Sequence, residues 1–102
     1  MEPLEEAESP GLGDPQDDEV ALFEEFARTQ SPDLQEQIVL RYSRLVVSLV
    51  KKFRGRAEWE DLVQVGYLGL LKAVNGYKPS SGFRFSTYAS HCVSGELRHY
   101  LR

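Results

Sequence analysis

The stretch Gly82-Phe83-Arg84-Phe85-Ser86-Thr87-Tyr88-Ala89-Ser90-His91-Cys92 carries three aromatic rings within six residues, with a cation and hydroxyls between them. Two interpretations fit this composition. The rings could be core residues at the start of a helix, or they could form a stacking surface for unpaired bases, because every base has an aromatic face. Taken alone, the stretch favours the core interpretation, so the choice depends on the rest of the chain.

The size and composition of the chain limit its class. Its 102 residues amount to one small domain, and its 41% hydrophobic content is ordinary for a folded one. No apolar run reaches the roughly 18 residues of a membrane span, and the acidic N-terminus has no apolar signal segment. We therefore expect a cytoplasmic protein without a membrane partner. The single cysteine, Cys92, makes no convincing metal set with His91 and His99, so we expect no metal and no cofactor.

The overall charge of −4 hides two unlike parts. Residues 1–25 carry ten acidic and no basic residues, which leaves twelve basic and six acidic residues in 26–102, a formal charge of +6. A basic body indicates an anionic partner such as nucleic acid, and the acidic segment beside it suggests something that screens the body. Whether the acidic segment screens or only aids solubility stays open at this point.

The chain divides into an arm and a helical body. Residues 1–16 hold few large apolar groups and several prolines, glycines and acids, which predicts a disordered acidic arm. In residues 17–102, apolar residues recur at steps of three, four and seven, which predicts an all-α domain, a compact bundle of about four helices. The predicted helices cover residues 17–29, 32–53, 58–75 and 86–102.

Capping residues set the predicted helix starts. Asp17 or Asp18 can cap the first helix, Ser31 caps the second, and Ser86 is expected to cap the fourth. Residues 77–82, between the third and fourth helices, form a loop by their proline, serine and glycine content. The aromatic stretch therefore lies where this loop enters the last helix.

Two glycines stand in the interior of the third predicted helix. Each of Gly66 and Gly69 costs up to about 1 kcal/mol relative to alanine, so a second helix is expected to pack closely there. The buried side of the helix is expected to begin at Trp59. A neighbouring strip is left exposed for a partner, and it contains Asp61, Gln64 and Leu68.

Two segments at a fixed separation resemble a known family. The first is Glu60-Asp61-Leu62-Val63-Gln64-Val65-Gly66-Tyr67-Leu68-Gly69-Leu70-Leu71-Lys72-Ala73-Val74, and the second runs from Phe83 to Ala89 and on to Gly95-Glu96-Leu97-Arg98. Over roughly residues 34–102, their order and spacing resemble region 2 of bacterial sigma factors of the sigma-70 family. The ending Gly95-Glu96-Leu97-Arg98-His99-Tyr100-Leu101-Arg102 resembles the stress and sporulation branch of the alternative sigma factors.

The resemblance implies a function in transcription initiation, with core RNA polymerase, promoter DNA and an anti-sigma factor as partners. It implies that the third helix docks on the clamp helices of the largest polymerase subunit through Asp61, Gln64, Leu68 and Leu71. It also implies that the aromatic stretch captures the non-template strand of the minus-ten promoter element, with Tyr88 beside a flipped adenine. Phosphate contacts fall to Lys51, Lys52 and Arg54. The residues matched to strand capture are Phe83, Arg84, Phe85, Ser86, Thr87, Tyr88, His91, Arg98 and Arg102.

The chain departs from the family pattern in three places. Housekeeping members carry paired tryptophans where this chain has His91 and Cys92, so strand opening is expected to be weaker. Val65 replaces a common acid, which puts one clamp contact in doubt. The chain also stops within the last predicted helix, so the regions that read the minus-thirty-five element are expected to be absent from it.

Other functions compete with promoter recognition. A truncated sigma-like interaction module would bind polymerase or an anti-sigma factor without recognising a promoter, and an unrelated helical bundle would place the aromatic rings in its core. An enzyme is not expected, because no catalytic triad, buried carboxylate pair or phosphate loop has a usable spacing. With the resemblance of the third helix added, the aromatic stretch favours base stacking, in a protein of the bacterial cytoplasm and nucleoid.

Overall fold

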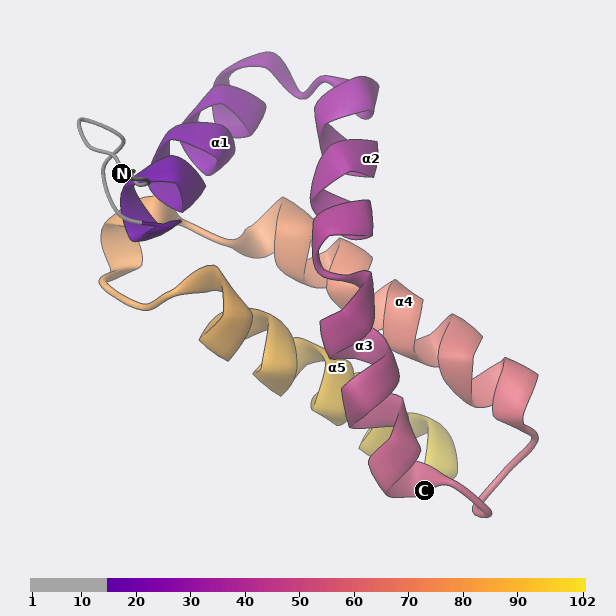
Figure 1. The fold of residues 1–102 in the computed structure, drawn as a ribbon. Helices are drawn as coiled ribbons and strands as arrows, with labels where there is room; N and C mark the ends of the chain where they lie inside the picture. Colours follow the sequence, from indigo (N-terminus) through magenta and orange to yellow (C-terminus); the bar gives the residue numbers. More distant parts are fainter. Residues whose placement is uncertain (1–14) are drawn as a thin grey trace, which may run out of the picture.

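The computed structural model describes residues 15–102, with side chains from Asp18 onward. This range contains five α-helices and two short 3-10 turns, and no strand occurs in it (Figure 1). The all-α class is therefore confirmed. The arm predicted over residues 1–16 lies outside the described residues, apart from its last two, which begin a helix. The elements are α1 (Pro15–Thr29), α2 (Pro32–Arg41), α3 (Ser43–Val50), η1 (Lys51–Phe53), α4 (Trp59–Gly76), η2 (Pro79–Ser81) and α5 (Phe85–Leu101).

The prediction of one helix over residues 32–53 is wrong. α2 ends at Arg41, Tyr42 takes backbone angles of φ −108° and ψ 14°, and α3 continues beyond this break (Figure 1). The Tyr42 N–H still bonds to the carbonyls of Ile38 and Val39, at 3.2 and 3.3 Å, so the interruption leaves this donor paired. Apolar spacing continues across the break, and spacing alone does not reveal it.

The predicted cap of the first helix is wrong, and the predicted cap of the second helix is confirmed. α1 begins at Pro15, so Asp17 and Asp18 lie inside the helix rather than at its cap. At the start of α2, the Ser31 hydroxyl accepts the Leu34 N–H at 3.3 Å, as the sequence predicts for a serine before a proline.

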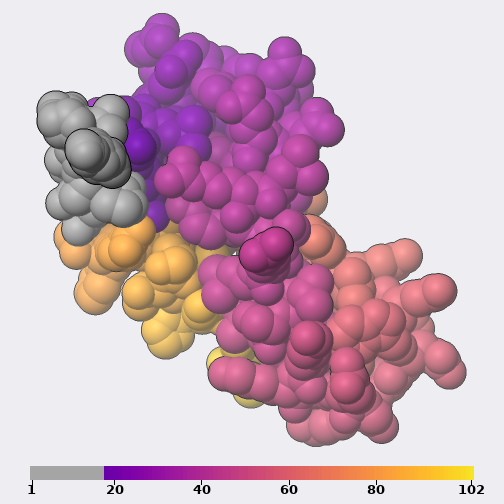
Figure 2. All heavy atoms as spheres, in the orientation of Figure 1, coloured from indigo at the N-terminus to yellow at the C-terminus, as the bar shows by residue number. Residues whose placement is uncertain are grey.

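The three helices α3, α4 and α5 pack against one another, and α1 lies beside η2 at the loop end of this group (Figure 1). In the space-filling view, side chains of α2 and α3 cover much of the near face (Figure 2). Within the described range, no helix combines the length and apolarity needed to cross a bilayer. The buried hydrophobic core consists of Phe23, Phe26, Ile38, Val46, Leu49, Val50, Leu62, Leu70, Ala73, Val74, Tyr77, Phe85, Ala89, Val93 and Leu97.

The glycines inside α4 allow two neighbouring helices to approach it, which confirms the predicted close packing. A Cβ on Gly69 would lie 2.7 Å from the Cα of Val93 in α5. A Cβ on Gly66 would lie 2.7 Å from Cγ2 of Val50 in α3. Real Cβ contacts are longer than this, so the packing of α4 against both neighbours requires these glycines.

Trp59 at the start of α4 was predicted to lie on the buried side of that helix, but it is 38% exposed. Tyr100 near the end of α5 is also exposed, at 46%. The guanidinium carbon of Arg54 lies 5.3 Å from the centre of the Trp59 ring. Trp59 therefore forms a surface cation–π contact rather than part of the core.

Candidate nucleic-acid interface

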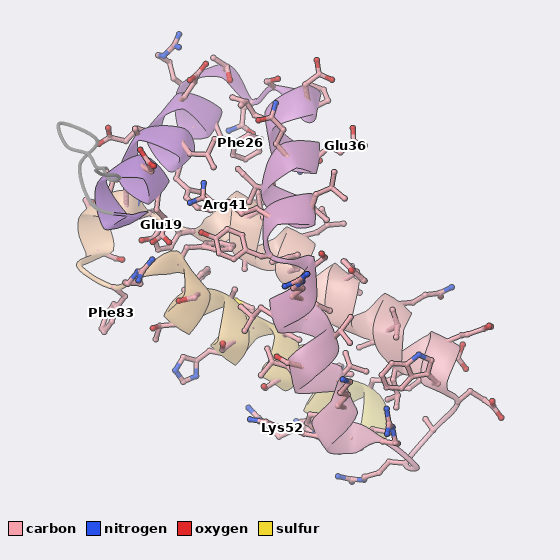
Figure 3. The ribbon with its side chains drawn as sticks, in the orientation of Figure 1. Glu19, Phe26, Glu36, Arg41, Lys52 and Phe83 are labelled. Carbon is pink, nitrogen blue, oxygen red and sulfur yellow. The ribbon has the colours of Figure 1, made fainter. Side chains whose placement is uncertain are left out.

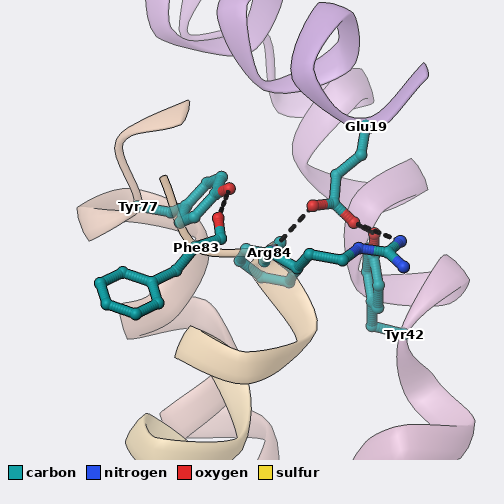
Figure 4. Close-up of polar contacts among 6 residues, drawn as sticks. Glu19, Tyr42, Tyr77, Phe83 and Arg84 are labelled. Atoms are coloured by element: carbon teal, nitrogen blue, oxygen red, sulfur yellow. Dashed lines mark hydrogen bonds and ion pairs between the residues drawn. The ribbon is translucent and has the colours of Figure 1, made fainter. Parts of the chain in front are cut away.

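The loop before α5 presents the ring of Phe83 to solvent on a fixed backbone. Gly82 has a φ of +88°, a backbone angle that residues with a side chain rarely adopt, and at this residue the chain turns away from η2. The Phe83 N–H donates to the Ser81 hydroxyl at 3.3 Å, and the Tyr77 hydroxyl donates to the Phe83 carbonyl (Figure 4). The Phe83 ring is 65% exposed and points away from the bundle (Figure 3). This geometry holds an exposed aromatic ring in one place.

The start of α5 is capped by a carboxylate from another helix. Glu19 of α1 is only 1% exposed, and its Oε2 accepts the Phe85 N–H at 2.8 Å. Its Oε1 accepts the Tyr42 hydroxyl at 3.0 Å and the Arg84 guanidinium at 3.3 Å (Figure 4). The predicted cap, Ser86, lies inside α5 and is not the cap. A buried anion at this helix N-terminus also interacts favourably with the helix dipole.

Four of the predicted strand-capture residues line one cavity of about 240 Å³ at the start of α5. These residues, Phe83, Thr87, Tyr88 and His91, supply two aromatic rings, a hydroxyl and an imidazole. Thr87 and His91 are exposed and one helical turn apart, and Tyr88 is half buried. Such a set can stack on a base and hydrogen-bond to its edge.

Tyr88 is positioned by the end of α4. Its ring centre lies 5.8 Å from that of Tyr77, and a Cβ on Gly76 would lie only 2.8 Å from its hydroxyl oxygen. Burial raises the pKa of Tyr88, and the neighbouring Cys92 thiol adds to the rise. The hydroxyl therefore stays protonated at neutral pH and is able to donate a hydrogen bond.

Phe85 and Ser86 are two of the five predicted strand-capture residues that do not line the cavity. Phe85 is fully buried, with its ring centre 4.4 Å from that of Phe23 and 4.7 Å from that of Tyr42. Its assignment to DNA contact is therefore corrected to a core role. Ser86 is half buried and does not line the cavity, and its carbonyl accepts the Ser90 hydroxyl at 2.8 Å.

The predicted cations lie in separate places. Arg84 is half exposed and forms an ion pair with Glu19 at 3.3 Å, so part of its charge is balanced within the chain. Arg98 and Arg102 are exposed near the other end of α5. None of the three lines the cavity.

The predicted phosphate contacts form a second basic region, at and just after η1. Lys51, Lys52 and Arg54 are all exposed, and Lys52 lies well apart from Phe83 (Figure 3). Lys51 also borders a hollow of about 370 Å³ between α3 and α4, together with Arg44. This region is therefore available to an anion, but it does not adjoin the aromatic cavity.

The predicted polymerase contacts share one exposed side of α4, which we call the docking strip. Its residues are Asp61, Gln64, Leu68 and Leu71. Leu68 and Leu71 are 47% and 37% exposed, which is high for leucine, and the glycines that meet α3 and α5 lie on another side of the helix. The docking strip thus combines a carboxylate, an amide and two apolar anchors open to a partner.

Sequence reasoning missed Glu19 and its partner Tyr42. Glu19 is four residues before Phe23, so it occupies a position on the apolar side of α1, and that interruption of the apolar pattern is the signal that was available. Burial is the largest cause, and the hydrogen bond to the Glu19 carboxylate the next, of a rise in the pKa of Tyr42 to about 12.

The chain matches a known family over most of the region just described. A model of the family described as Sigma-70 region 2 matches residues 38–102, close to the predicted 34–102. The match therefore starts inside α2 and includes the aromatic cavity and the docking strip, whereas Glu19 precedes it.

Individual relatives agree with this match. The chain is 38% identical over 82 residues to the RNA polymerase sigma-G factor of Bacillus subtilis, covering 79% of this chain and 32% of that protein. It is 38% identical over 87 residues to the sigma-B factor of Bacillus anthracis, covering 84% and 34%. It is 49% identical over 69 residues to the sigma-C factor of a Nostoc species, covering 65% and 17%.

The predicted resemblance to alternative sigma factors is confirmed by these relatives. The chain spans about a third of the length of the sigma-G and sigma-B factors it matches. The residues that match the family model, 38–102, include the cavity and the docking strip. The chain therefore belongs to the sigma-70 family, of which it carries region 2.

Proposed function

We propose that this chain serves RNA polymerase as a sigma-type initiation module that captures the non-template strand of the minus-ten promoter element. The observation that carries the proposal is the single cavity lined by Phe83, Thr87, Tyr88 and His91. Each of these was predicted for strand capture from the sequence, and they come from both the loop and the first turns of α5. No catalytic group is assigned to the chain, because strand capture is a binding event and phosphoryl transfer belongs to the polymerase.

The cavity suits a base that has left the duplex. Extruding a base costs a few kcal/mol, and each base stacked on an aromatic ring recovers about 1–3 kcal/mol. The exposed Phe83 ring offers a stacking face, and the Tyr88 hydroxyl offers a donor for the edge of the base. Because the Phe83 backbone is held by two hydrogen bonds, little of this energy is lost in ordering the loop.

The cations would position the DNA without reading its sequence. Arg98 and Arg102 extend the interface along α5, and Lys51, Lys52 and Arg54 offer phosphate contacts at a second place. Contacts of this kind set the register and the salt dependence of binding. The stable pairing of Arg84 with Glu19 makes Arg84 a weaker phosphate ligand than an unpaired arginine would be.

The docking strip would bind the clamp helices of the largest polymerase subunit. Leu68 and Leu71 supply apolar area, and Asp61 and Gln64 supply polar contacts that fix the register. The same exposed leucines favour the alternative function, an interaction module that binds polymerase or an anti-sigma factor without promoter recognition. Since His91 and Cys92 replace the tryptophan pair of housekeeping members, strand capture here would depend more strongly on the cavity.

Binding to single-stranded oligonucleotides separates the two functions. With a minus-ten-like strand and a scrambled strand at several salt concentrations, fluorescence anisotropy should show a preference for the first that persists at moderate salt. Tyr88→Ala should weaken that binding by about 1–3 kcal/mol, or roughly five- to 150-fold. Tyr100→Ala, which removes an exposed tyrosine of the same helix outside the cavity, is the matched control.

If the wild-type chain instead bound both strands equally, and lost this binding entirely as the salt concentration rose, the result would support the interaction module. A pull-down with core RNA polymerase completes the comparison. Gln64→Ala and Leu68→Ala should reduce the amount recovered, whereas Gln37→Ala, an exposed glutamine of α2, should not.

A further inference from the structure

The hollow between α3 and α4 is a second concave site, separate from the aromatic cavity. Its volume of about 370 Å³ falls within the range of about 300–1,000 Å³ that small-molecule sites occupy. Apart from Lys51, none of its residues has a part in the function proposed above. The residues that line it are Ser43, Arg44, Val47, Ser48 and Lys51 from α3 and η1 and Tyr67 from α4. These six side chains decide which ligand suits it.

The two walls of the hollow are held together by a tight helix contact. A Cβ on Gly66 of α4 would lie only 2.7 Å from Cγ2 of Val50 in α3. Tyr67 directly follows this glycine and Lys51 directly follows this valine, so the walls start from the line where the two helices touch (Figure 1). Because close-packed helices do not slide freely, the hollow keeps its shape before any ligand arrives.

The wall from α3 and η1 presents two cations on one side of the helix. Arg44 and Lys51 are seven residues apart, which places them about 10 Å apart along the axis and on the same face. Both are exposed, and from Ser43 to Phe53 the chain has three basic residues and no acidic one. In the part of the chain that the structure describes, no carboxylate pairs with either cation. This wall therefore favours an anion, and phosphate is the anion that such groups bind best.

Hydroxyl oxygens and an aromatic ring complete the lining. The Ser43 hydroxyl donates to the Leu40 carbonyl at 3.0 Å, and the Ser48 hydroxyl donates to the Leu45 carbonyl at 2.8 Å. Each serine oxygen keeps its lone pairs for a donor on a ligand. From α4, the half-buried Tyr67 adds a ring on which a flat base can stack. The hollow thus offers cations for phosphate, acceptors for sugar hydroxyls and a stacking partner for a base.

We propose that this hollow binds a nucleoside diphosphate or triphosphate. The phosphates lie between Arg44 and Lys51, a ribose hydroxyl donates to Ser48, and the base stacks on Tyr67. The site shares no residue with the aromatic cavity, so the inference does not depend on strand capture. With a nucleotide bound, Lys51 would be less available to a DNA phosphate.

Isothermal titration calorimetry of the full chain at physiological salt tests the chemistry of the ligand. ADP should bind about three- to tenfold more tightly than AMP, and adenosine more weakly than both, because the second phosphate brings more charge to two cations. Pyrophosphate should bind at least about fivefold more weakly than ADP, because it has no base to stack.

Variants test the residues that hold the ligand. Arg44→Gln should weaken ADP binding about three- to tenfold, whereas Arg56→Gln, at an exposed arginine outside the hollow, should leave it unchanged. Tyr67→Leu should weaken ADP binding at least about fivefold and leave pyrophosphate binding unchanged. Ser48→Ala should weaken ADP binding about two- to tenfold with little change in Tm, since this serine is exposed and its hydroxyl bonds within its own helix.

Chemical-shift mapping by ¹H–¹⁵N NMR locates the bound ADP. The amide shifts should concentrate between Ser43 and Lys51 and around Tyr67. Shifts concentrated instead between Phe83 and His91 would place the base in the aromatic cavity and overturn the inference.

Three other results would also overturn it. One is no measurable binding of ADP by the wild-type chain. Another is pyrophosphate binding as tight as that of ADP, which would leave only a surface for simple anions. The third is Arg56→Gln weakening ADP binding as much as Arg44→Gln, which would reduce the effect to overall charge. If Tyr67→Leu does not fold, the two exposed variants Arg44→Gln and Ser48→Ala and the shift map still decide. A wild-type chain without preference for the minus-ten strand refutes the proposed function and leaves this site standing.

Discussion

The buried carboxylate of Glu19 provides the sharpest test of how this fold is held together. Glu19→Ala removes the acceptor of three donors: the Phe85 N–H at 2.8 Å, the Tyr42 hydroxyl at 3.0 Å and the Arg84 guanidinium at 3.3 Å. Because the carboxylate is 1% exposed, water does not replace it freely. The variant should therefore be destabilised through the junction of α1, α2 and α5.

The three contacts contribute differently to the free energy of unfolding. The buried Phe85 N–H left without a partner costs about 1–3 kcal/mol, which also includes the loss of the α5 cap. The half-buried Tyr42 hydroxyl loses about 0.5–1.5 kcal/mol, because it can turn partly to water. The Arg84 ion pair contributes about 0.2–1 kcal/mol, since half of that side chain is exposed. Together these give a loss of about 2–5 kcal/mol in the free energy of unfolding.

Urea unfolding followed by circular dichroism measures this loss, and thermal unfolding should show a Tm lowered by at least about 8 °C. Glu24→Ala removes the same charge from an exposed position of α1 and should change stability by less than about 0.5 kcal/mol. Glu19→Gln keeps one acceptor oxygen for the Phe85 N–H and should fall between the two. If Glu19→Ala were as stable as Glu24→Ala, the carboxylate would not be the cap of α5 and the reasoning would fail.

Three further perturbations test other contacts. Gly69→Ala should destabilise the fold by about 1–3 kcal/mol in urea unfolding, because its Cβ would lie 2.7 Å from the Val93 Cα, and an effect no larger than that of Ser48→Ala would contradict the packing argument. Stability should fall as the pH rises from 10 to 12, because the folded state, with the Tyr42 pKa raised to about 12, holds the hydroxyl proton more tightly than the unfolded state does; Tyr42→Phe should flatten this slope in urea unfolding at pH 8 and 11. Trp59→Ala should change the Tm little despite the size of the ring, since Trp59 is 38% exposed and contacts Arg54 at the surface, and a large loss would show that it belongs to the core.

The helix class, the close packing at Gly66 and Gly69 and the residues of the cavity were predictable because each leaves a local signal. Apolar spacing marks helices, and helix glycines mark close approach. The family resemblance added the order of the two segments, and this changed the interpretation of the aromatic stretch from a helix start in the core to a candidate strand-capture site. That Phe85 belongs to the core rather than the cavity needed the structure, because alternation of buried and exposed rings is not visible in a run of three aromatics.

The break at Tyr42 and the role of Glu19 were not predictable from local pattern. Both depend on residues far apart in the chain meeting at one point, the start of α5. Tyr42 interrupts its helix where its ring meets Phe85 and its hydroxyl meets Glu19, and neither partner is near it in sequence. Glu19 was counted with the acids of the N-terminal segment, whose negative charge concealed that one of them is buried.

The last turn of α4 has a consequence for how the two binding surfaces of the molecule would be joined. Gly76 ends the helix that carries the docking strip, and the space left by its missing side chain is where the Tyr88 hydroxyl lies. If a partner displaced that turn, it would change the depth of the cavity, so the two binding equilibria would be linked. Linkage is reciprocal: whatever factor polymerase adds to the affinity for the strand, the strand must add to the affinity for polymerase. Enlarging residue 76 would then reduce strand affinity from a position that touches no DNA.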